Sequence, residues 1–350
     1  MGEGVEIRRL FRAMKGLAAV VAGLALWPVW ARAETVEEFY KRTPLTMYVG
    51  SGAGGGFDEI GRAFGPRFAR HLPGNPAFVV KNMPGAGGLL NVNFMYNSAP
   101  RDGSVFAAPF NTVFMLPLFG DPAAKFDPRE FTWLGSLDKQ TGTCVVWHTS
   151  SVKTLEDAQQ REVLVGATGT NSTPAIFSNV LNTLLHTKLK IINGYATNEL
   201  RFALERGETE GICGLAWQTY KAVSPAWVSE GSIRPIAQLG LTVNKDLPDV
   251  PMAIDMLKNE SDRKVFELTV LPQEFGRPFM APPDIPADRA AAMRKAFAET
   301  LRDPEFLADA AKIRLSLDPM SGDDIKALLD RAYAEPKDVI ERAAKFSVVN

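Results

Sequence analysis

The sequence predicts an α/β protein with two domains, and three observations lead to this prediction. The chain has 350 residues, which suits two α/β domains better than one small core. Hydrophobic residues make up 46% of it, enough to form a sizeable core. Short apolar runs alternate with helical patterns in both halves, and several runs end in glycine- or hydroxyl-rich loops. Such alternation is typical of mostly parallel sheets, which bind ligands at the carboxyl ends of their strands, so we expect a ligand cleft between the domains.

The first 33 residues have the pattern of an export signal. Basic residues between positions 8 and 15 precede an apolar run over 17–30, and Ala31-Arg32-Ala33 follows it. Small residues at 31 and 33 suit a signal peptidase, so we predict a signal peptide over 1–33, cleavage before Glu34 and a periplasmic product. The alternative is an uncleaved anchor, although the apolar run is short for a transmembrane helix.

Strand and helix patterns alternate through the first domain. The run over 45–49 enters a glycine loop, and the helix expected over 58–72 carries an apolar residue at every fourth position. Another glycine-rich segment, 84–88, separates the second strand from a helix expected over 89–98. Three strands are expected here, over 45–49, 77–80 and 104–108.

The second domain repeats this alternation. A hydroxyl-rich loop follows the run over 163–166 and leads into a helix over 175–185. Further along, 277–283 is a proline-containing extended bridge, and the remainder of the chain is helical. Five strands are expected in this domain, over 143–147, 163–166, 189–193, 210–215 and 233–239.

The first glycine loop has the Gly50-x-Gly52-x-x-Gly55 spacing of a dinucleotide-binding fingerprint. That fingerprint requires an acidic residue at the end of the second strand, but this strand ends in Lys81-Asn82. A phosphate-binding P-loop requires a Gly-Lys-Ser/Thr sequence, which does not follow here. Two interpretations stay open, a purely structural turn and a backbone anion site for a small carboxylate. The second would use Gly52, Ala53, Gly54, Gly55, Phe57 and Asp58.

Three further loops are candidates for ligand contact. The loop before the helix at 175–185 offers hydroxyl and amide groups, and the alternative for each of them is an ordinary helix cap. Asn111-Thr112 lies at a strand-to-helix junction, and Tyr195 lies in the loop after another strand. The candidates in the hydroxyl-rich loop are Thr168, Thr170, Asn171, Ser172 and Thr173.

The chain shows no signature of catalysis or metal binding. It has no Gly-x-Ser-x-Gly elbow, no cysteine–histidine motif and no pair of carboxylates suited to acid–base work. Two cysteines and three histidines at their spacings make no zinc site, so we expect no metal and no cofactor. In an oxidising compartment Cys144 and Cys213 either form a disulfide or remain two buried thiols, and the sequence leaves both open.

Several motifs together resemble the Bug-type extracytoplasmic solute receptors of tripartite tricarboxylate transporters. They include Gly54-Gly55-x-x-Asp58, the run Asn82-Met83-Pro84-Gly85-Ala86-Gly87-Gly88 and Ala99-Pro100-Arg101-Asp102-Gly103. A Gly-Thr-Asn-Ser-Thr loop at 169–173, the Gly207-Glu208 turn and the Ala281-Pro282 bridge complete the set. The resemblance covers essentially the whole chain after residue 33. Gly50, Phe57 and Glu210 depart from the family pattern, which bears on the identity of the ligand.

The resemblance implies a type II periplasmic-binding-protein fold with two α/β domains. The first domain would be discontinuous, over 34–142 and 272–350, and the second would span 143–271. A ligand carboxylate would lie between loops of both domains, held by backbone amides and hydroxyls. The matching positions are the loop 52–58, Asn111 and Thr112, the loop 168–173 and Tyr195.

The expected function is that of a monomeric periplasmic receptor rather than an enzyme. It would capture a small organic carboxylate, such as a di- or tricarboxylate or an aromatic acid, and deliver it to the permease subunits of a tripartite transporter. The net charge of −1 favours neither nucleic acid nor anionic membrane as a partner. Two alternatives remain, a carboxylate-sensing subunit for a membrane histidine kinase and an exported enzyme with an unrecognised site.

Overall fold

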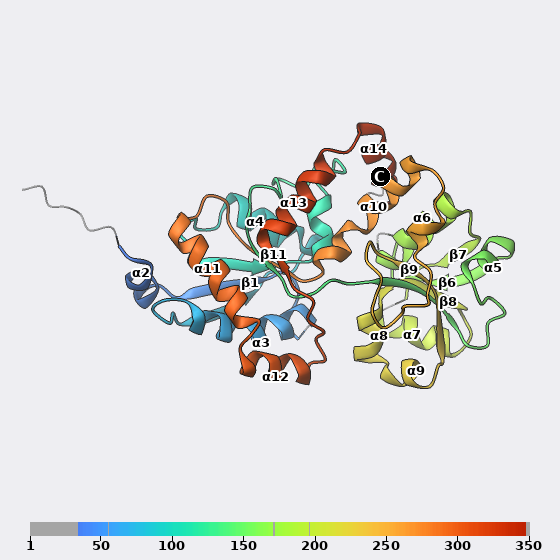
Figure 1. Ribbon diagram of the computed structural model, residues 1–350, viewed down its shortest axis with the longest axis horizontal. Helices are drawn as coiled ribbons and strands as arrows, with labels where there is room; N and C mark the ends of the chain where they lie inside the picture. Colours follow the sequence, from blue (N-terminus) through green and yellow to red (C-terminus); the bar gives the residue numbers. More distant parts are fainter. Residues whose placement is uncertain (1–33, 55, 171, 196, 348–350) are drawn as a thin grey trace, which may run out of the picture. The chain divides into compact units, whose positions relative to one another are not determined.

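The computed structural model describes residues 34–347 with the exception of 55, 171 and 196. The expected signal peptide lies outside the described residues. From Val36 onward the chain forms one unit by its contacts. Within it, the strands form two separate sheets with helices around them, as the sequence predicts (Figure 1). No helix in the described part is long and apolar enough to cross a membrane.

The first sheet has six strands in the order β11-β4-β10-β3-β1-β2. Parallel pairing joins β1 to β2 and to β3, whereas β10 runs antiparallel to β3 and β4. The expected extended bridge at 277–283 is therefore a sheet strand. The strands are β1 Leu45–Val49, β2 Phe78–Asn82, β3 Val105–Ala108, β4 Thr132–Ser136, β10 Pro278–Ala281 and β11 Met320–Ser321.

The second sheet has five strands in the order β7-β6-β8-β5-β9. Its parallel part is β7-β6-β8, and β5 runs antiparallel to β8 and β9. All five lie close to their predicted positions. They are β5 Gly142–Trp147, β6 Val163–Gly166, β7 Leu189–Ile192, β8 Gly211–Ala216 and β9 Ile233–Leu239.

The two sheets share one plan, in which an antiparallel strand is inserted beside three parallel strands. The inserted strand is β10 in the first sheet and β5 in the second. The two chain segments that pass from sheet to sheet are hydrogen-bonded to one another. Three backbone hydrogen bonds join them. Leu137 N–H donates to the Arg277 carbonyl (3.0 Å), Gly276 N–H donates to the Asp138 carbonyl (3.0 Å), and Gln140 N–H donates to the Gln273 carbonyl (2.7 Å). We call segments 137–141 and 271–277 the crossing segments.

Helices flank both sheets, and the three with predicted bounds, at 58–72, 89–98 and 175–185, begin within two residues of those positions. Asn111 begins a short 3₁₀ helix, η2, rather than a full α-helix. The α-helices are α2 Val36–Arg42, α3 Gly56–His71, α4 Leu89–Asn97, α5 Leu155–Gln160, α6 Thr173–Leu185, α7 Thr197–Glu205, α8 Trp217–Val223, α9 Pro225–Ser229, α10 Glu260–Val270, α11 Ala287–Thr300, α12 Pro304–Lys312, α13 Gly322–Tyr333 and α14 Lys337–Ser347. The 3₁₀ helices are η1 Ala86–Gly88, η2 Asn111–Met115, η3 Ala253–Met256 and η4 Leu271–Phe275.

Helix α3 fixes the position of the first glycine loop because it packs closely on β1 and β2. Its predicted apolar stripe is buried, with Phe64 and Phe68 fully inaccessible. Two glycines on the same helix face the sheet: a Cβ on Gly61 would collide with Met47, and one on Gly65 would collide with Phe78. Phe64 also packs against Phe279 of β10, so the core of this sheet includes the C-terminal part of the chain.

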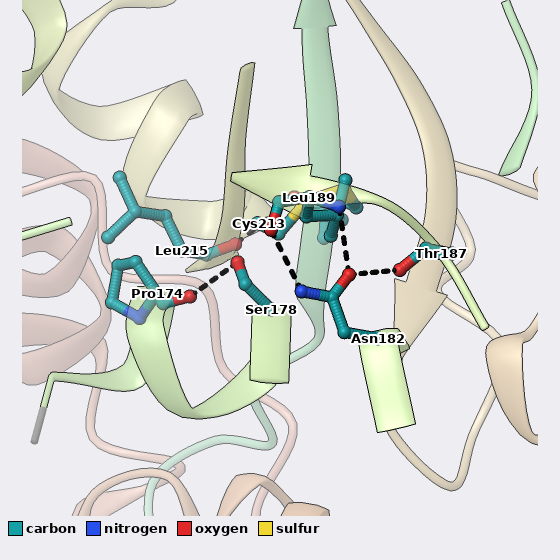
Figure 2. Close-up of a disulfide and its surroundings, with 9 residues drawn as sticks. Pro174, Ser178, Asn182, Thr187, Leu189, Cys213 and Leu215 are labelled. Atoms are coloured by element: carbon teal, nitrogen blue, oxygen red, sulfur yellow. Dashed lines mark hydrogen bonds between the residues drawn. A yellow bond between two sulfur atoms is a disulfide. The ribbon is translucent and has the colours of Figure 1, made fainter. Parts of the chain in front are cut away.

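A disulfide joins Cys144 of β5 to Cys213 of β8 (Figure 2). These residues are direct partners in the antiparallel register, and both side chains are buried. Helix α6 lies beside this part of the sheet. Its Asn182 accepts from Leu189 N–H and donates to the Leu189 carbonyl, both at 2.8 Å, and so ties α6 to the start of β7.

Candidate functional site

A cavity of about 940 Å³ is lined by loops that follow strands of both sheets. Five residues predicted to bind ligand line it together: Thr168, Ser172 and Thr173 from the β6–α6 loop, and Asn111 and Thr112 from η2. The two loops are separated by more than fifty residues in sequence. The fold therefore combines the predicted second-domain loop with one of the predicted first-domain contacts.

The N-terminal turn of α6 offers anion-binding groups to this cavity. Ser172 occupies the cap position, but its hydroxyl donates to the Gly169 carbonyl (2.6 Å) instead of capping the helix. The backbone N–H groups of Thr173 and Ala175 belong to the first turn, where helical carbonyls provide no partner. Because α6 has 13 residues, its aligned peptide dipoles place a partial positive charge at this end.

Gly214 of β8 allows the strand to pass close to the start of α6. Its φ is +112°, and a Cβ on it would lie 2.7 Å from the Thr173 carbonyl oxygen. Any other residue would push the strand away from the helix. This glycine therefore helps to hold the Thr173 end of α6 against the cavity wall, to which Gly214 itself contributes.

Asn111 connects η2 to a crossing segment. Its side chain is almost fully buried, and its amide donates to the Pro272 carbonyl at 2.6 Å. The neighbouring Thr112 is exposed and lines the cavity. Asn111 therefore has a positioning role in this structure, while the Thr112 hydroxyl is available to a ligand.

The crossing segments contribute two lining residues that sequence reasoning missed, Gln140 and Gln273. Gln273 is only 5% exposed, and its Oε1 is buried without a hydrogen-bond partner among the described residues. The resemblance implies a domain boundary near 272, and a segment that crosses between domains would border the cleft, which is the signal that could have pointed to Gln273. Other lining residues outside the predicted set are Ala86, Gly87, Leu89, Phe110, Val113, Leu116, Asp121, Ala123, Pro174, Ile176, Leu200, Gly214, Leu215, Ala216 and Thr219.

The first glycine loop does not line this cavity. Gly52, Ala53 and Gly54 are exposed, and the carboxylate of Asp58 is used within the loop itself. It accepts from Gly54 N–H (2.8 Å) and from Arg62 Nε (2.9 Å). The hydrogen bond from Arg62 is the largest of the effects that lower the pKa of Asp58 to about 2. The loop thus supplies its own anion.

Asn82, at the end of β2, completes this arrangement. Its Nδ2 donates to Asp58 Oδ1 (2.9 Å) and to the Ser51 carbonyl (3.0 Å). A dinucleotide-binding protein would place a ribose-binding acid at this strand end. Here the residue is an amide that ties the glycine loop to the sheet.

Phe57 reaches the cavity only through another aromatic ring. It packs edge-on against Phe110, with 4.8 Å between ring centroids, and Phe110 lines the cavity. Thr170 and Tyr195 also lie outside the lining, and Tyr195 packs beside the apolar cluster that contains Trp217. Gly55 and Asn171, both predicted to bind ligand, lie outside the described residues.

The cavity has an unusual charge balance for an anion site. Among its described lining residues there is no lysine, arginine or histidine, and Asp121 is the single ionisable side chain. One oxygen of Asp121 accepts from Ala123 N–H at 2.8 Å, which fixes the carboxylate in a turn. Within the described part of the chain, no group of three or more histidine, cysteine or acidic residues is arranged to hold a metal.

A largely buried ion pair also links the crossing segments. Asp138 is almost fully buried and pairs with Arg277. Burial raises the pKa of Asp138 to about 6, although the charge and the hydrogen bond of Arg277 oppose this shift. A Cβ on Gly276 would lie 2.8 Å from Asp138 Oδ1, so the glycine permits this close approach.

Comparisons with known proteins give relatives in sequence and in structure. No protein-family model matches the chain. A UPF0065 protein in the gbd 5′ region of Cupriavidus necator is 27% identical over 256 residues, covering 70% of this chain and 73% of the relative. A UPF0065 protein in the TAR-I ttuE–ttuC′ intergenic region of Agrobacterium vitis is 24% identical over 335 residues, covering 93% and 89%.

Solved structures of solute-binding proteins share the fold. A TctC solute-binding protein from Polaromonas superposes with a TM-score of 0.69 at 20% identity, covering 87% of this chain and 99% of that one. MatC from Rhodopseudomonas palustris, solved with bound malate, gives 0.60 at 18% identity and covers 85% and 99%. The periplasmic binding protein BugD gives 0.57 at 18% identity and covers 86% and 95%.

These matches confirm two predictions made from the sequence. The chain has the periplasmic-binding-protein fold, with a mixed α/β architecture built on two sheets. Its resemblance to Bug-type receptors is also confirmed, since the TctC and BugD structures share the fold and two UPF0065 proteins are 27% and 24% identical to the chain.

Proposed function

We propose that the chain is a periplasmic solute receptor that captures a small organic carboxylate and delivers it to the membrane permease of a tripartite-type transporter. The observation that carries this proposal is the cavity of about 940 Å³, lined by the hydroxyl-bearing start of α6 and by η2. A cavity of this size suits a small organic molecule.

A carboxylate is the chemistry that this cavity favours. The first turn of α6 supplies backbone N–H groups and a partial positive charge, which together form an anion site at a helix N-terminus. The hydroxyls of Thr168 and Thr173 add further donors, while that of Ser172 holds the loop by donating to the Gly169 carbonyl. The malate bound in the MatC structure supports the same ligand class.

Capture would proceed by hinge closure around the bound acid. A ligand that touches loops from both sheets stabilises the closed arrangement by its greater affinity for that state. The crossing segments join the two sheets and hydrogen-bond to one another beside the cavity, so we expect the hinge to lie in them. No catalytic step is included, so the acid is expected to leave unchanged.

Export is part of the proposal. The apolar run at 17–30 and the Ala31-Arg32-Ala33 site support a periplasmic location. The structural neighbour BugD is a periplasmic binding protein, which supports the same location. The intact mass of the protein recovered from the periplasm should correspond to a chain that begins at Glu34. A mass that includes residues 1–33 would support the uncleaved anchor instead.

In the source organism, uptake of the acid should stop when this chain is deleted.

The first prediction concerns the start of α6. Replacing Ser172→Ala and Thr173→Ala together removes the Thr173 hydroxyl donor from the cavity and the Ser172 hydroxyl that holds the loop at Gly169. Hydrogen bonds to a charged group contribute about 1.5–3 kcal/mol each, so affinity for the best carboxylate should fall at least about tenfold. Isothermal titration calorimetry measures the affinity, and thermal unfolding confirms that the variant is folded.

A matched control is Ser321→Ala, which alters the cap of α13. Ser321 accepts from Asp324 N–H at 3.2 Å and does not line the cavity. Loss of a cap costs about 1 kcal/mol of stability, so this variant should melt earlier and bind the acid normally. Unchanged affinity in the Ser172/Thr173 double variant would contradict the assignment of the binding loop.

A further inference from the structure

We propose that a small apolar pocket beside the ligand cavity receives a short alkyl branch of the bound carboxylate. This pocket has a volume of about 40 Å³, and we call it the side pocket. The inference rests on the proposed function. It narrows the ligand to acids that carry a methyl or ethyl branch close to the carboxyl group.

The side pocket adjoins the ligand cavity. Four residues line both spaces, Thr112, Thr173, Ile176 and Gln273. A group in the side pocket can therefore belong to a molecule that is held in the ligand cavity. At about 40 Å³, against about 940 Å³ for the cavity, the side pocket is too small for a second ligand. A space needs at least about 10–15 Å³ to hold one water-sized group, so a methyl or ethyl branch suits it.

Beyond the shared residues, the described wall of the side pocket is mainly apolar. It is formed by Met115, Phe119, Phe177, Thr269 and Pro272. Met115 and Phe177 are at most 3% exposed, so this end of the pocket lies among buried side chains. Removing a hydrocarbon group from water into such surroundings is favourable.

Water is a poor occupant of this end of the pocket. A buried water needs two to four polar partners. The Thr269 hydroxyl already donates to the Val265 carbonyl (2.9 Å), and the Pro272 carbonyl already accepts from the Asn111 amide (2.6 Å). An alkyl group needs no hydrogen bond, so it is the occupant that this wall favours.

Helix α6 sets how far the branch lies from the carboxylate. Thr173 begins the helix and borders both spaces, and Phe177 follows it by four residues, on the same helix face. One helical turn rises only about 5.4 Å, and side chains tilt towards the N-terminal end of their helix. An acid anchored at the start of α6 therefore has the carbon next to its carboxyl group close to the side pocket. A branch on this carbon is the one that fits.

Acids that differ by one alkyl branch test this inference. Calorimetry would compare succinate, butanoate and phenylacetate, each with its 2-methyl and 2-ethyl derivative. Burial of one methylene group strengthens binding about fourfold. In the series that the protein binds, we expect the 2-methyl or the 2-ethyl derivative to bind at least about threefold more tightly than its parent acid.

Two variants change the size of the side pocket in opposite directions. Thr269→Met fills it, so the advantage of the branched acids should disappear. Phe119→Leu enlarges it at a half-buried position, so the affinity for the 2-ethyl derivative relative to the 2-methyl derivative should rise at least about threefold. The melting temperature of each variant reports whether it is folded.

A matched control is Thr300→Met in α11. Thr300 makes the same kind of bond within its helix, from its hydroxyl to the Ala296 carbonyl (2.7 Å), and it lines neither the cavity nor the side pocket. Overpacking should lower the melting temperature of this variant. Its preference for branched acids should equal that of the unaltered protein.

Xenon provides a test that requires no acid, because small apolar cavities bind it. A crystal of the unaltered protein under xenon pressure should show a xenon atom in the side pocket, beside Met115 and Phe177. A crystal of Thr269→Met should show none there. Absence of xenon from the side pocket of the unaltered protein would overturn its apolar character.

The outcomes separate this inference from the proposed function. Binding of a parent acid without any gain from a branch would overturn the inference and leave a carboxylate receptor in place. An unchanged branch preference in folded Thr269→Met would overturn the assignment of the side pocket. Absence of binding by every acid in the set would contradict the proposed function, and the inference about its ligand would fall with it.

Discussion

At the scale of single residues, Asp58 holds the first glycine loop together through hydrogen bonds within the chain. The sequence places an acidic residue after the loop, where it would face the positive end of α3 or cap it. In the structure, its carboxylate bonds to Gly54, Arg62 and Asn82. The carboxylate that occupies this loop is therefore a side chain of the chain itself. The groups offered to an external anion lie at the start of α6.

Asp58 should make acid stability depend on its charge. The pKa of this carboxyl is lowered from its ordinary value of 3.8 to about 2. Its contribution is therefore complete above about pH 4 and is lost as the pH falls through 2. Because Arg62 is half exposed and water screens the pair, we expect a contribution of about 1 kcal/mol.

The measurement is urea unfolding of the protein and of Asp58→Asn at several pH values. The variant should be less stable by about 1 kcal/mol at pH 7, and the difference should shrink as the pH approaches 2. A difference that stays constant across this range would show that the charge of Asp58 is not the stabilising feature.

Asp138 should make the stability of the protein change with pH in the opposite direction. Burial raises the pKa of its carboxyl to about 6, so the native state holds this proton more tightly than the unfolded chain does. Its contribution to stability is complete below about pH 4 and is lost as the pH rises through 6. Asp138→Asn should remove a pH-dependent loss of about 2 kcal/mol between pH 4 and pH 7, although it also leaves Arg277 without its charged partner.

Unfolding free energies of both proteins across pH 4–7 provide this measurement. The readout is the slope with pH, because the variant is expected to be less stable in absolute terms. Parallel curves for the two proteins would contradict the raised pKa of Asp138.

At the scale of elements, strand register decides the state of the cysteines. The sequence leaves a disulfide and two free thiols equally open, since the residues are far apart along the chain. Antiparallel pairing of β5 with β8 places Cys144 directly opposite Cys213, and the structure joins them. A link across 69 residues is expected to stabilise the fold, typically by about 2–4 kcal/mol.

Thiol labelling tests this pairing. Protein purified from an oxidising compartment, denatured without reductant, should show no reactive thiol, and reduction should reveal two. The Cys144→Ser variant should then show one thiol in either condition. Two free thiols in the unreduced protein would rule out the bond.

Strands with strong local patterns were predictable, and those that depend on distant partners were not. The strands at 45–49 and 163–166 are largely apolar runs with clear boundaries, and the structure confirms them. β4 and β11 were missed because they are strands through pairing with distant segments: β4 pairs with β10, and the two-residue β11 pairs with β4. The run at 277–283 was recognised as extended, but its place inside the first sheet depends on contacts with β3 and β4.

At the scale of the whole molecule, the fold and part of the candidate site follow from sequence. The β6–α6 loop and Asn111-Thr112 were recognised because hydroxyl and amide residues follow strand ends, and the structure brings them to one cavity. No local sequence pattern marks Gln140 and Gln273 as residues of the site. Their position depends on the two crossing segments lying side by side, which arises only when both sheets have formed.

The central claim is that this cavity binds a carboxylate, and a thermal-shift screen of the purified protein beginning at Glu34 tests it most directly. The screen would include mono-, di- and tricarboxylates, aromatic acids, amino acids and NAD. We predict that at least one carboxylate raises the melting temperature in a concentration-dependent way, that it is recovered unchanged, and that NAD has no effect. A shift with NAD alone, or no shift with any acid, would contradict the account.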